Sequence, residues 1–191
     1  MFDKGYIGIV GIGWLVFYAY WLIAAISAKK VVRKGRGIWI WPRLAILLVA
    51  LITIRLSLAR KNVDDHTILT VHSIAIRNVG VVLFLTGLGL AVWARKNLST
   101  NWGMPMSQKA RPELIISGPY AAIRHPIYTG ILIALFGTAL TIGLYLLFIW
   151  FAVAAYFIFS ATREEQYMLQ KFPQKYNEYK KTTKMLLPYI F

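Results

Sequence analysis

Three side chains that could take part in chemistry, Arg124, His125 and Tyr128, lie within five consecutive positions. They belong to residues 118–130, which read GPYAAIRHPIYTG. Histidine exchanges a proton near neutral pH, and a guanidinium binds carboxylates and phosphates. Pro126 fits the first turn of a helix, where its missing N–H costs nothing, so Tyr128 is expected in that turn beside His125. The alternative interpretation is an interfacial anchor, in which Arg binds lipid phosphate and Tyr joins the aromatic belt.

Two adjacent carboxylates, Glu164 and Glu165, form a second polar group. They are two of only seven acidic residues in the chain. Either carboxylate could recognise a cationic ligand or the hydroxyls of a sugar. The alternative is structural, because negative side chains stabilise the N-terminus of a following helix.

The remaining histidines, His66 and His72, stand near Asp64 and Asp65 without the ligand spacing of a metal site. We interpret this segment as a solvated loop and predict no metal. The chain contains no cysteine, which excludes a disulfide scaffold, a thiolate metal site and a Cys nucleophile.

The composition indicates a membrane protein. Of the 191 residues, 58% are hydrophobic and 15% are charged, and the net charge is +15. A soluble domain carries about 25% charged residues and cannot bury so much apolar surface. An ordinary soluble globule, a disordered chain and a coiled coil are therefore excluded. Nucleic-acid binders are basic but seldom this apolar, so no nucleic-acid partner is predicted.

The expected fold is all-α, a polytopic membrane protein with five transmembrane helices and a small cytoplasmic cap. A bilayer-spanning helix needs about 20 mostly apolar residues. Residues 6–28, 38–58 and 74–94 meet this requirement, and the tract without charged residues that follows is barely long enough for two short spans, residues 127–140 and 144–161. The last two form a short hairpin with its turn at residues 141–143. The cap combines residues 95–125 and 162–191, which flank that hairpin and should meet in space.

The distribution of basic residues predicts the orientation. Sixteen of the 22 Lys and Arg residues lie in three regions on one side: the loops after the first and third spans and the segment after the fifth. The positive-inside rule places those regions in the cytoplasm and the N-terminus outside. We predict an integral protein of an inner or ER-type membrane, whose basic loops also bind anionic lipid headgroups. No obligate protein partner is evident.

The RHPxY segment resembles the G-P-Y-x-x-x-R-H-P-x-Y-x-G signature of integral-membrane methyltransferases. That group includes the isoprenylcysteine carboxyl methyltransferases and the phosphatidylethanolamine N-methyltransferases. The similarity extends upstream to Ala94-Arg95 with Leu98 and Trp102, and covers roughly residues 93–191. Its downstream part consists of Glu164, Glu165, Phe172, Tyr176, Tyr179 and Pro188.

The resemblance implies methyl transfer from S-adenosylmethionine at the cytoplasmic face, to a lipophilic or prenylated acceptor. The implied catalytic residues are Arg124, His125 and Glu165. The implied cofactor-binding residues are Tyr120, His125, Pro126, Tyr128, Glu164, Glu165 and Tyr179. The candidates for substrate binding are Lys184 and Trp102.

The acceptor is the point at which alternatives stay open. We predict O-methylation of an isoprenylcysteine-type carboxylate, which is already nucleophilic and needs no strong base. The resembling isoprenylcysteine enzymes commonly place an Arg after the position of Tyr179, and Thr182 stands there in this chain, with Lys184 nearby. N-methylation of an ethanolamine phospholipid is the first alternative. A non-catalytic membrane lipid-binding or assembly protein is the second.

Overall fold

The computed structural model describes residues 2–26, 31–33, 71, 73–99, 108–109 and 113–187. The predicted second span, residues 38–58, lies outside the described residues, as do His66, His72 and Trp102.

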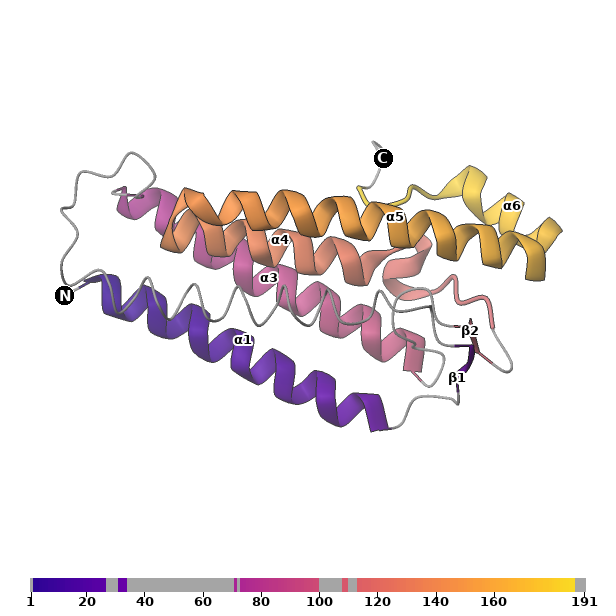
Figure 1. Ribbon diagram of the computed structural model, residues 1–191, viewed down its shortest axis with the longest axis horizontal. Helices are drawn as coiled ribbons and strands as arrows, with labels where there is room; N and C mark the ends of the chain where they lie inside the picture. Colours follow the sequence, from indigo (N-terminus) through magenta and orange to yellow (C-terminus); the bar gives the residue numbers. More distant parts are fainter. Residues whose placement is uncertain are drawn as a thin grey trace.

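Four long helices run alongside one another: α1 (Phe2–Ile26), α3 (Ile74–Leu98), α4 (Pro126–Ile142) and α5 (Leu147–Lys171). A shorter helix, α6 (Pro173–Thr182), follows α5, and two 3₁₀ turns, η2 (Gly118–Ala121) and η3 (Leu144–Leu146), precede α4 and α5. Figure 1 shows that α1, α3 and α5 end, and α4 begins, at the same end of the bundle, where α6 also lies. The polar segments that the structure describes on either side of the last two long helices are thus gathered at one end of an apolar body.

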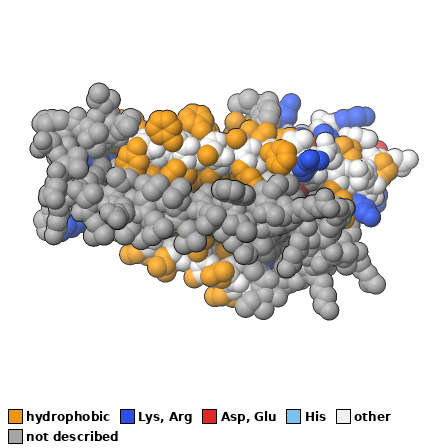
Figure 2. All heavy atoms as spheres, in the orientation of Figure 1, with side chains coloured by type: hydrophobic (Ala, Val, Ile, Leu, Met, Phe, Trp, Pro, Cys, Tyr) orange, Lys and Arg blue, Asp and Glu red, His pale blue; other side chains and the backbone are white. Residues whose placement is uncertain are grey.

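The predicted helical fold is confirmed, and within the described residues three helices are long and apolar enough to cross a membrane. They are Lys4–Ala24, Ile74–Leu98 and Leu144–Lys171, and the apolar α4 is shorter. Large hydrophobic side chains stay exposed along them, among them Leu15, Leu85 and Phe148. On the face drawn in Figure 2, hydrophobic side chains cover the middle of the described surface, and Lys and Arg gather near α6. This distribution is that of a protein whose body faces lipid.

Glycines bring the backbones of α3 and α4 into direct contact. A Cβ on Gly87 would lie 2.4 Å from the Ala134 nitrogen and 2.6 Å from the Gly130 oxygen. A Cβ on Gly137 would lie 2.4 Å from the Gly80 oxygen. Small residues permit such close approach of membrane helices. The seam fixes the start of α4, and hence His125, relative to α3.

Buried Arg95 ties the end of α1 to the end of α3. Its guanidinium donates to the Ala24 carbonyl and, at 2.6 Å, to the Ser99 carbonyl. The last carbonyls of a helix have no partner within the helix, so a cation here satisfies them and complements the helix dipoles.

The helix bounds revise the sequence interpretation of the two glutamates. The hairpin turn falls at Gly143, and α5 continues past the predicted span end at residue 161 as far as Lys171. Glu164 and Glu165 therefore lie in the last turns of α5, and the following helix begins only at Pro173. The alternative in which these carboxylates stabilise the N-terminus of a following helix is wrong.

Two short strands were not predicted. β1 (Val31–Arg33) and β2 (Gln108–Lys109) pair antiparallel at the polar end of the bundle. They add a minimal ribbon to a helical fold.

Candidate functional site

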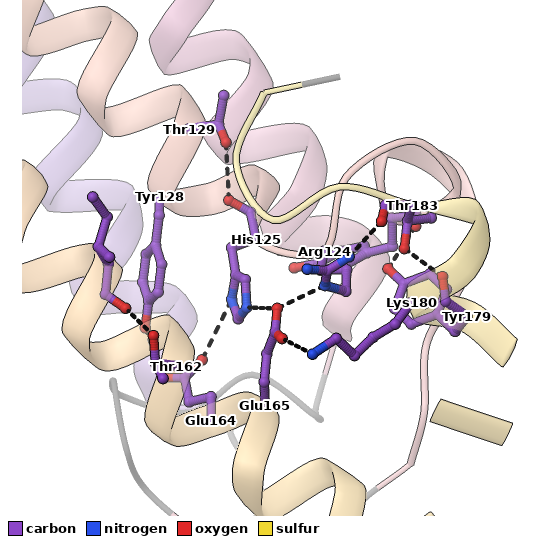
Figure 3. Close-up of polar contacts among 12 residues, drawn as sticks. Arg124, His125, Tyr128, Thr129, Thr162, Glu164, Glu165, Tyr179, Lys180 and Thr183 are labelled. Atoms are coloured by element: carbon purple, nitrogen blue, oxygen red, sulfur yellow. Dashed lines mark hydrogen bonds and ion pairs between the residues drawn. The ribbon is translucent and has the colours of Figure 1, made fainter. Parts of the chain in front are cut away.

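Three segments distant in sequence meet at the polar end of the bundle. The first turn of α4 presents His125 and Tyr128, and the last turns of α5 present Glu164 and Glu165 (Figure 3). The chain after α6 runs beside the start of α4, because the amide of Arg124 donates to the Lys184 carbonyl at 2.8 Å. The amide of His125 donates to the next carbonyl, at 3.1 Å. The expected meeting of the two polar regions is thus realised for their described parts.

Glu165 is a buried carboxylate surrounded by three cationic or potentially cationic groups. Its Oε1 accepts a hydrogen bond from Arg124 Nε at 2.6 Å, and its Oε2 lies 2.9 Å from Lys180 Nζ. His125 Nε2 is 3.5 Å from Oε1. The side chain of Glu165 is only 5% exposed. These contacts join α4, α5 and α6, so Glu165 acts as a structural clamp at the site.

Arg124 extends that clamp to the segment after α6. Its guanidinium also donates to the carbonyl of Thr183, while the Thr183 hydroxyl donates to the Tyr179 carbonyl at 2.6 Å. One guanidinium with several fixed donors can serve a carboxylate and a carbonyl at once.

Glu164 has a different environment although it is the next residue. Its Oε1 accepts a hydrogen bond from the Tyr128 hydroxyl at 2.6 Å, and its Oε2 is 3.7 Å from His125 Nδ1. Its side chain is 29% exposed. A carboxylate has about four lone-pair sites, so Glu164 can accept further hydrogen bonds from a ligand.

A stack of three rings holds the imidazole between the carboxylates. The His125 and Tyr128 rings are parallel within 4° with centroids 5.4 Å apart, and Tyr128 stacks on Phe157 at 4.4 Å. His125 Nε2 is buried and completes no hydrogen bond within the described part of the chain. The imidazole is thus oriented by its neighbours and retains unused hydrogen-bonding capacity.

Two buried tyrosines, Tyr120 and Tyr179, are joined by a hydrogen bond near the site. The Tyr179 hydroxyl donates to the Tyr120 carbonyl at 2.6 Å. Burial raises the pKa of Tyr179 to about 12 and raises the pKa of Tyr120 further. Both phenols stay neutral at physiological pH, so they act as donors and packing groups and do not act as bases.

The remaining predicted residues that the structure describes differ in burial. Pro126 occupies the first turn of α4 and is buried. Lys184 is exposed, and its carbonyl is engaged by Arg124. Sequence reasoning missed Lys180, which the structure brings to Glu165. The signal was its spacing from Tyr176 and Tyr179, since positions i, i+3 and i+4 share one helix face, and a Lys on a buried face needs a partner.

Comparisons with known proteins identify the family of the chain and a similar fold. The sequence model of the phospholipid methyltransferase family matches residues 76–175. Among solved structures, the fold is similar to that of the eukaryotic intramembrane Ras methyltransferase, isoprenylcysteine carboxyl methyltransferase, with a TM-score of 0.67 and 21% identity. The alignment covers 97% of this chain and 66% of that one. No curated protein matches the sequence. The apolar helices and this fold identify an integral membrane protein.

Proposed function

Because this chain belongs to the phospholipid methyltransferase family, we propose that it transfers a methyl group from S-adenosylmethionine to a lipophilic acceptor at the membrane interface. The observation that carries the proposal is the cluster of Arg124, His125, Glu164 and Glu165 at the polar end of apolar helices. Two carboxylates one residue apart have different environments, one locked and one partly exposed. Such a division suits a site that must be rigid and still bind a ligand.

The residues present fit S-adenosylmethionine. That molecule carries an ammonium group and two ribose hydroxyls, which need acceptors, and Glu164 is a partly exposed carboxylate oriented by Tyr128. Buried His125 Nε2 offers a further polar atom without a completed hydrogen bond among the described residues. When bound, the group supplies an electrophilic methyl on a sulfonium. Glu164 would hold its ammonium or ribose, while Glu165 and Arg124 keep the surrounding segments in place.

The proposed acceptor is an isoprenylcysteine-type carboxylate. A carboxylate oxygen forms the new bond to the methyl carbon while the methyl–sulfur bond breaks and its electron pair stays on sulfur. No proton leaves the acceptor, so the protein needs to position the reactants at about 3 Å and exclude water. Lys184 on the segment after α6 is the cation proposed to attract such an acceptor, with Trp102 as a further substrate-binding residue.

N-methylation of an ethanolamine headgroup is the second candidate, and the family description favours it. An amine must lose a proton before or during attack, and a base is then required. His125 lies 3.7 Å from Glu164 and could accept that proton. A non-catalytic lipid-binding protein is the remaining alternative.

In the proposed topology, five helices cross the membrane, with the second at residues 38–58. The N-terminus lies outside, and the cap of residues 95–125 and 162–191 lies in the cytoplasm. The charge asymmetry supports this orientation. Single cysteines introduced near Lys34 and near Asp64 should be labelled from opposite sides of a sealed vesicle. Labelling from the same side would overturn the orientation.

Transfer of labelled methyl to a panel of prenylcysteine analogues and phospholipids tests the function directly. S-adenosylhomocysteine at 100 times its dissociation constant should also stabilise the solubilised protein by about 2.7 kcal/mol, if it binds only the folded state. Absence of both stabilisation and transfer would favour the non-catalytic alternative.

A further inference from the structure

Two buried hydroxyls on α5, those of Tyr156 and Ser160, complete no hydrogen bond within the described part of the chain. Ser160 is fully buried. Five threonines in the helices behave differently, since each hydroxyl donates to the carbonyl four residues earlier. These are Thr86, Thr129, Thr138, Thr141 and Thr162. The Ser160 hydroxyl could donate to the carbonyl four residues earlier in the same way, but it does not.

Tyr156, Ser160 and Glu164 lie on one face of α5, because they are spaced by four residues. Each step of four residues is slightly more than one helical turn, about 6 Å along the axis. The two hydroxyls approach one another without completing a hydrogen bond of good geometry. They therefore form a polar ladder that leads from Glu164 into the apolar body of the bundle.

The surroundings of this ladder are apolar. The Tyr156 ring lies 5.9 Å from that of Phe157, which in turn stacks on Tyr128. Buried hydroxyls in such surroundings cost free energy unless a partner satisfies them. Each hydroxyl has one hydrogen to donate, so a hydrogen-bond-accepting oxygen placed between them would satisfy both donors.

We propose that Tyr156 and Ser160 form a recognition site for a hydrogen-bond-accepting oxygen group of the lipid acceptor. The inference rests on the proposed function and deepens it by assigning the acceptor side of the site. Glu164 and His125 lie together at the polar end of α5, where the proposed function places the charged methyl donor. The hydroxyl pair lies one and two helical turns further into the apolar part of α5, which in the proposed topology is the side that a lipid acceptor would reach. The oxygen belongs either to a prenylcysteine carboxylate or to a phospholipid headgroup or ester.

Equilibrium binding to the solubilised full chain tests the site without requiring turnover. The probes are N-acetyl-S-farnesylcysteine, a farnesyl thioether that lacks the carboxyl group, and dioleoyl phosphatidylethanolamine. Tyr156→Phe and Ser160→Ala should each weaken binding of the oxygen-bearing lipid about three- to tenfold, the size expected for one hydrogen bond. Affinity for the carboxyl-free thioether and for S-adenosylhomocysteine should not change.

Thr162→Val is the matched control, because its hydroxyl is on the same helix and bonds to the Ile158 carbonyl. It should bind every probe as the wild type does. Preference of the wild type for the farnesylcysteine or for the phospholipid identifies the source of the oxygen.

Wild-type affinity in both hydroxyl variants, whether or not their stability changes, would overturn the inference and assign the pair to a buried water. Failure of the wild type to bind either oxygen-bearing lipid would overturn it as well. Binding that depends on both hydroxyls without any methyl transfer would uphold this site and contradict the proposed function instead. Methyl transfer with unchanged Michaelis constants in both variants would uphold the function and contradict this site.

Discussion

The seam between α3 and α4 and the polar cluster at the end of the bundle hold the same helix, α4, by opposite means. In the seam, Gly87 and Gly137 have no side chain, so backbone meets backbone. In the cluster, the residues before and after Pro126 are held by long side chains, with Arg124 on Glu165 and Tyr128 on Glu164. The glycine seam leaves no room for an added side-chain atom. In the polar cluster, by contrast, some residues can hold the helices together while others remain available to bind a ligand.

Glu165→Ala should have the largest effect, because it removes the common partner of Arg124 and Lys180. Breaking a buried ion pair by removing one member costs about 3–5 kcal/mol, since the remaining charge is left uncompensated. We expect a loss of that order in the free energy of unfolding of the solubilised protein. Glu178→Ala, an exposed acid on α6, is the control and should leave stability unchanged. Equal stabilities of the two variants would remove the clamp role of Glu165.

Gly87→Ala should destabilise the seam by about 3 kcal/mol, the upper part of the range for overpacking, because the obstacle is backbone. Gly89→Ala, two residues along the same helix, adds the same methyl group where no described atom lies within 4 Å. That control should be neutral or slightly stabilising, since alanine favours helix. The measurement is the thermal unfolding midpoint of both variants. Equal midpoints would contradict the direct backbone contact between α3 and α4 at Gly87.

Glu164→Gln should separate binding from support within the polar cluster. The amide keeps the size of the side chain and an acceptor for Tyr128 but loses the charge. Losing one charge-assisted hydrogen bond weakens affinity about tenfold to a hundredfold. We expect calorimetry to show this loss for S-adenosylhomocysteine with little change in stability. Wild-type affinity of the variant for S-adenosylhomocysteine would show that Glu164 is not the residue that holds this ligand.

Tyr179→Phe should have the smallest effect on stability, and it should also change how stability depends on pH. The pKa of Tyr179 rises from the ordinary value of about 10 to about 12 on folding, because burial disfavours the phenolate. The stabilisation is therefore fully present below pH 10 and is lost as the pH rises through 12. Tyr179→Phe should cost about 1 kcal/mol at pH 8 through the lost bond to the Tyr120 carbonyl. The melting temperature of the variant should also fall less steeply than that of the wild type between pH 10 and pH 12. A fall as steep as that of the wild type would mean that other groups cause it.

The sequence allowed prediction of the features that depend on neighbouring residues. Apolar runs located the four long helices α1, α3, α4 and α5, and Pro126 placed the start of α4 with Tyr128 in its first turn. The features that depend on distant residues could not be predicted in the same way. Lys180 meets Glu165 only because α6 folds back beside α5, and the role of the two glutamates required the true end of α5 at Lys171. The sequence of α3 alone could not show that Gly87 contacts the backbone of α4 whereas Gly89 has no described neighbouring atom within 4 Å.

The stack of His125 on Tyr128, and of Tyr128 on Phe157, has a spectroscopic consequence. Protons above the face of an aromatic ring are shielded by its ring current, so the imidazole CH protons of His125 should resonate upfield of an unstacked histidine. The chain holds only three histidines, which makes this signal easy to assign by substitution. A ligand that enters beside Glu164 and tilts the imidazole would move the resonance, so His125 can report occupancy of the site without any added label.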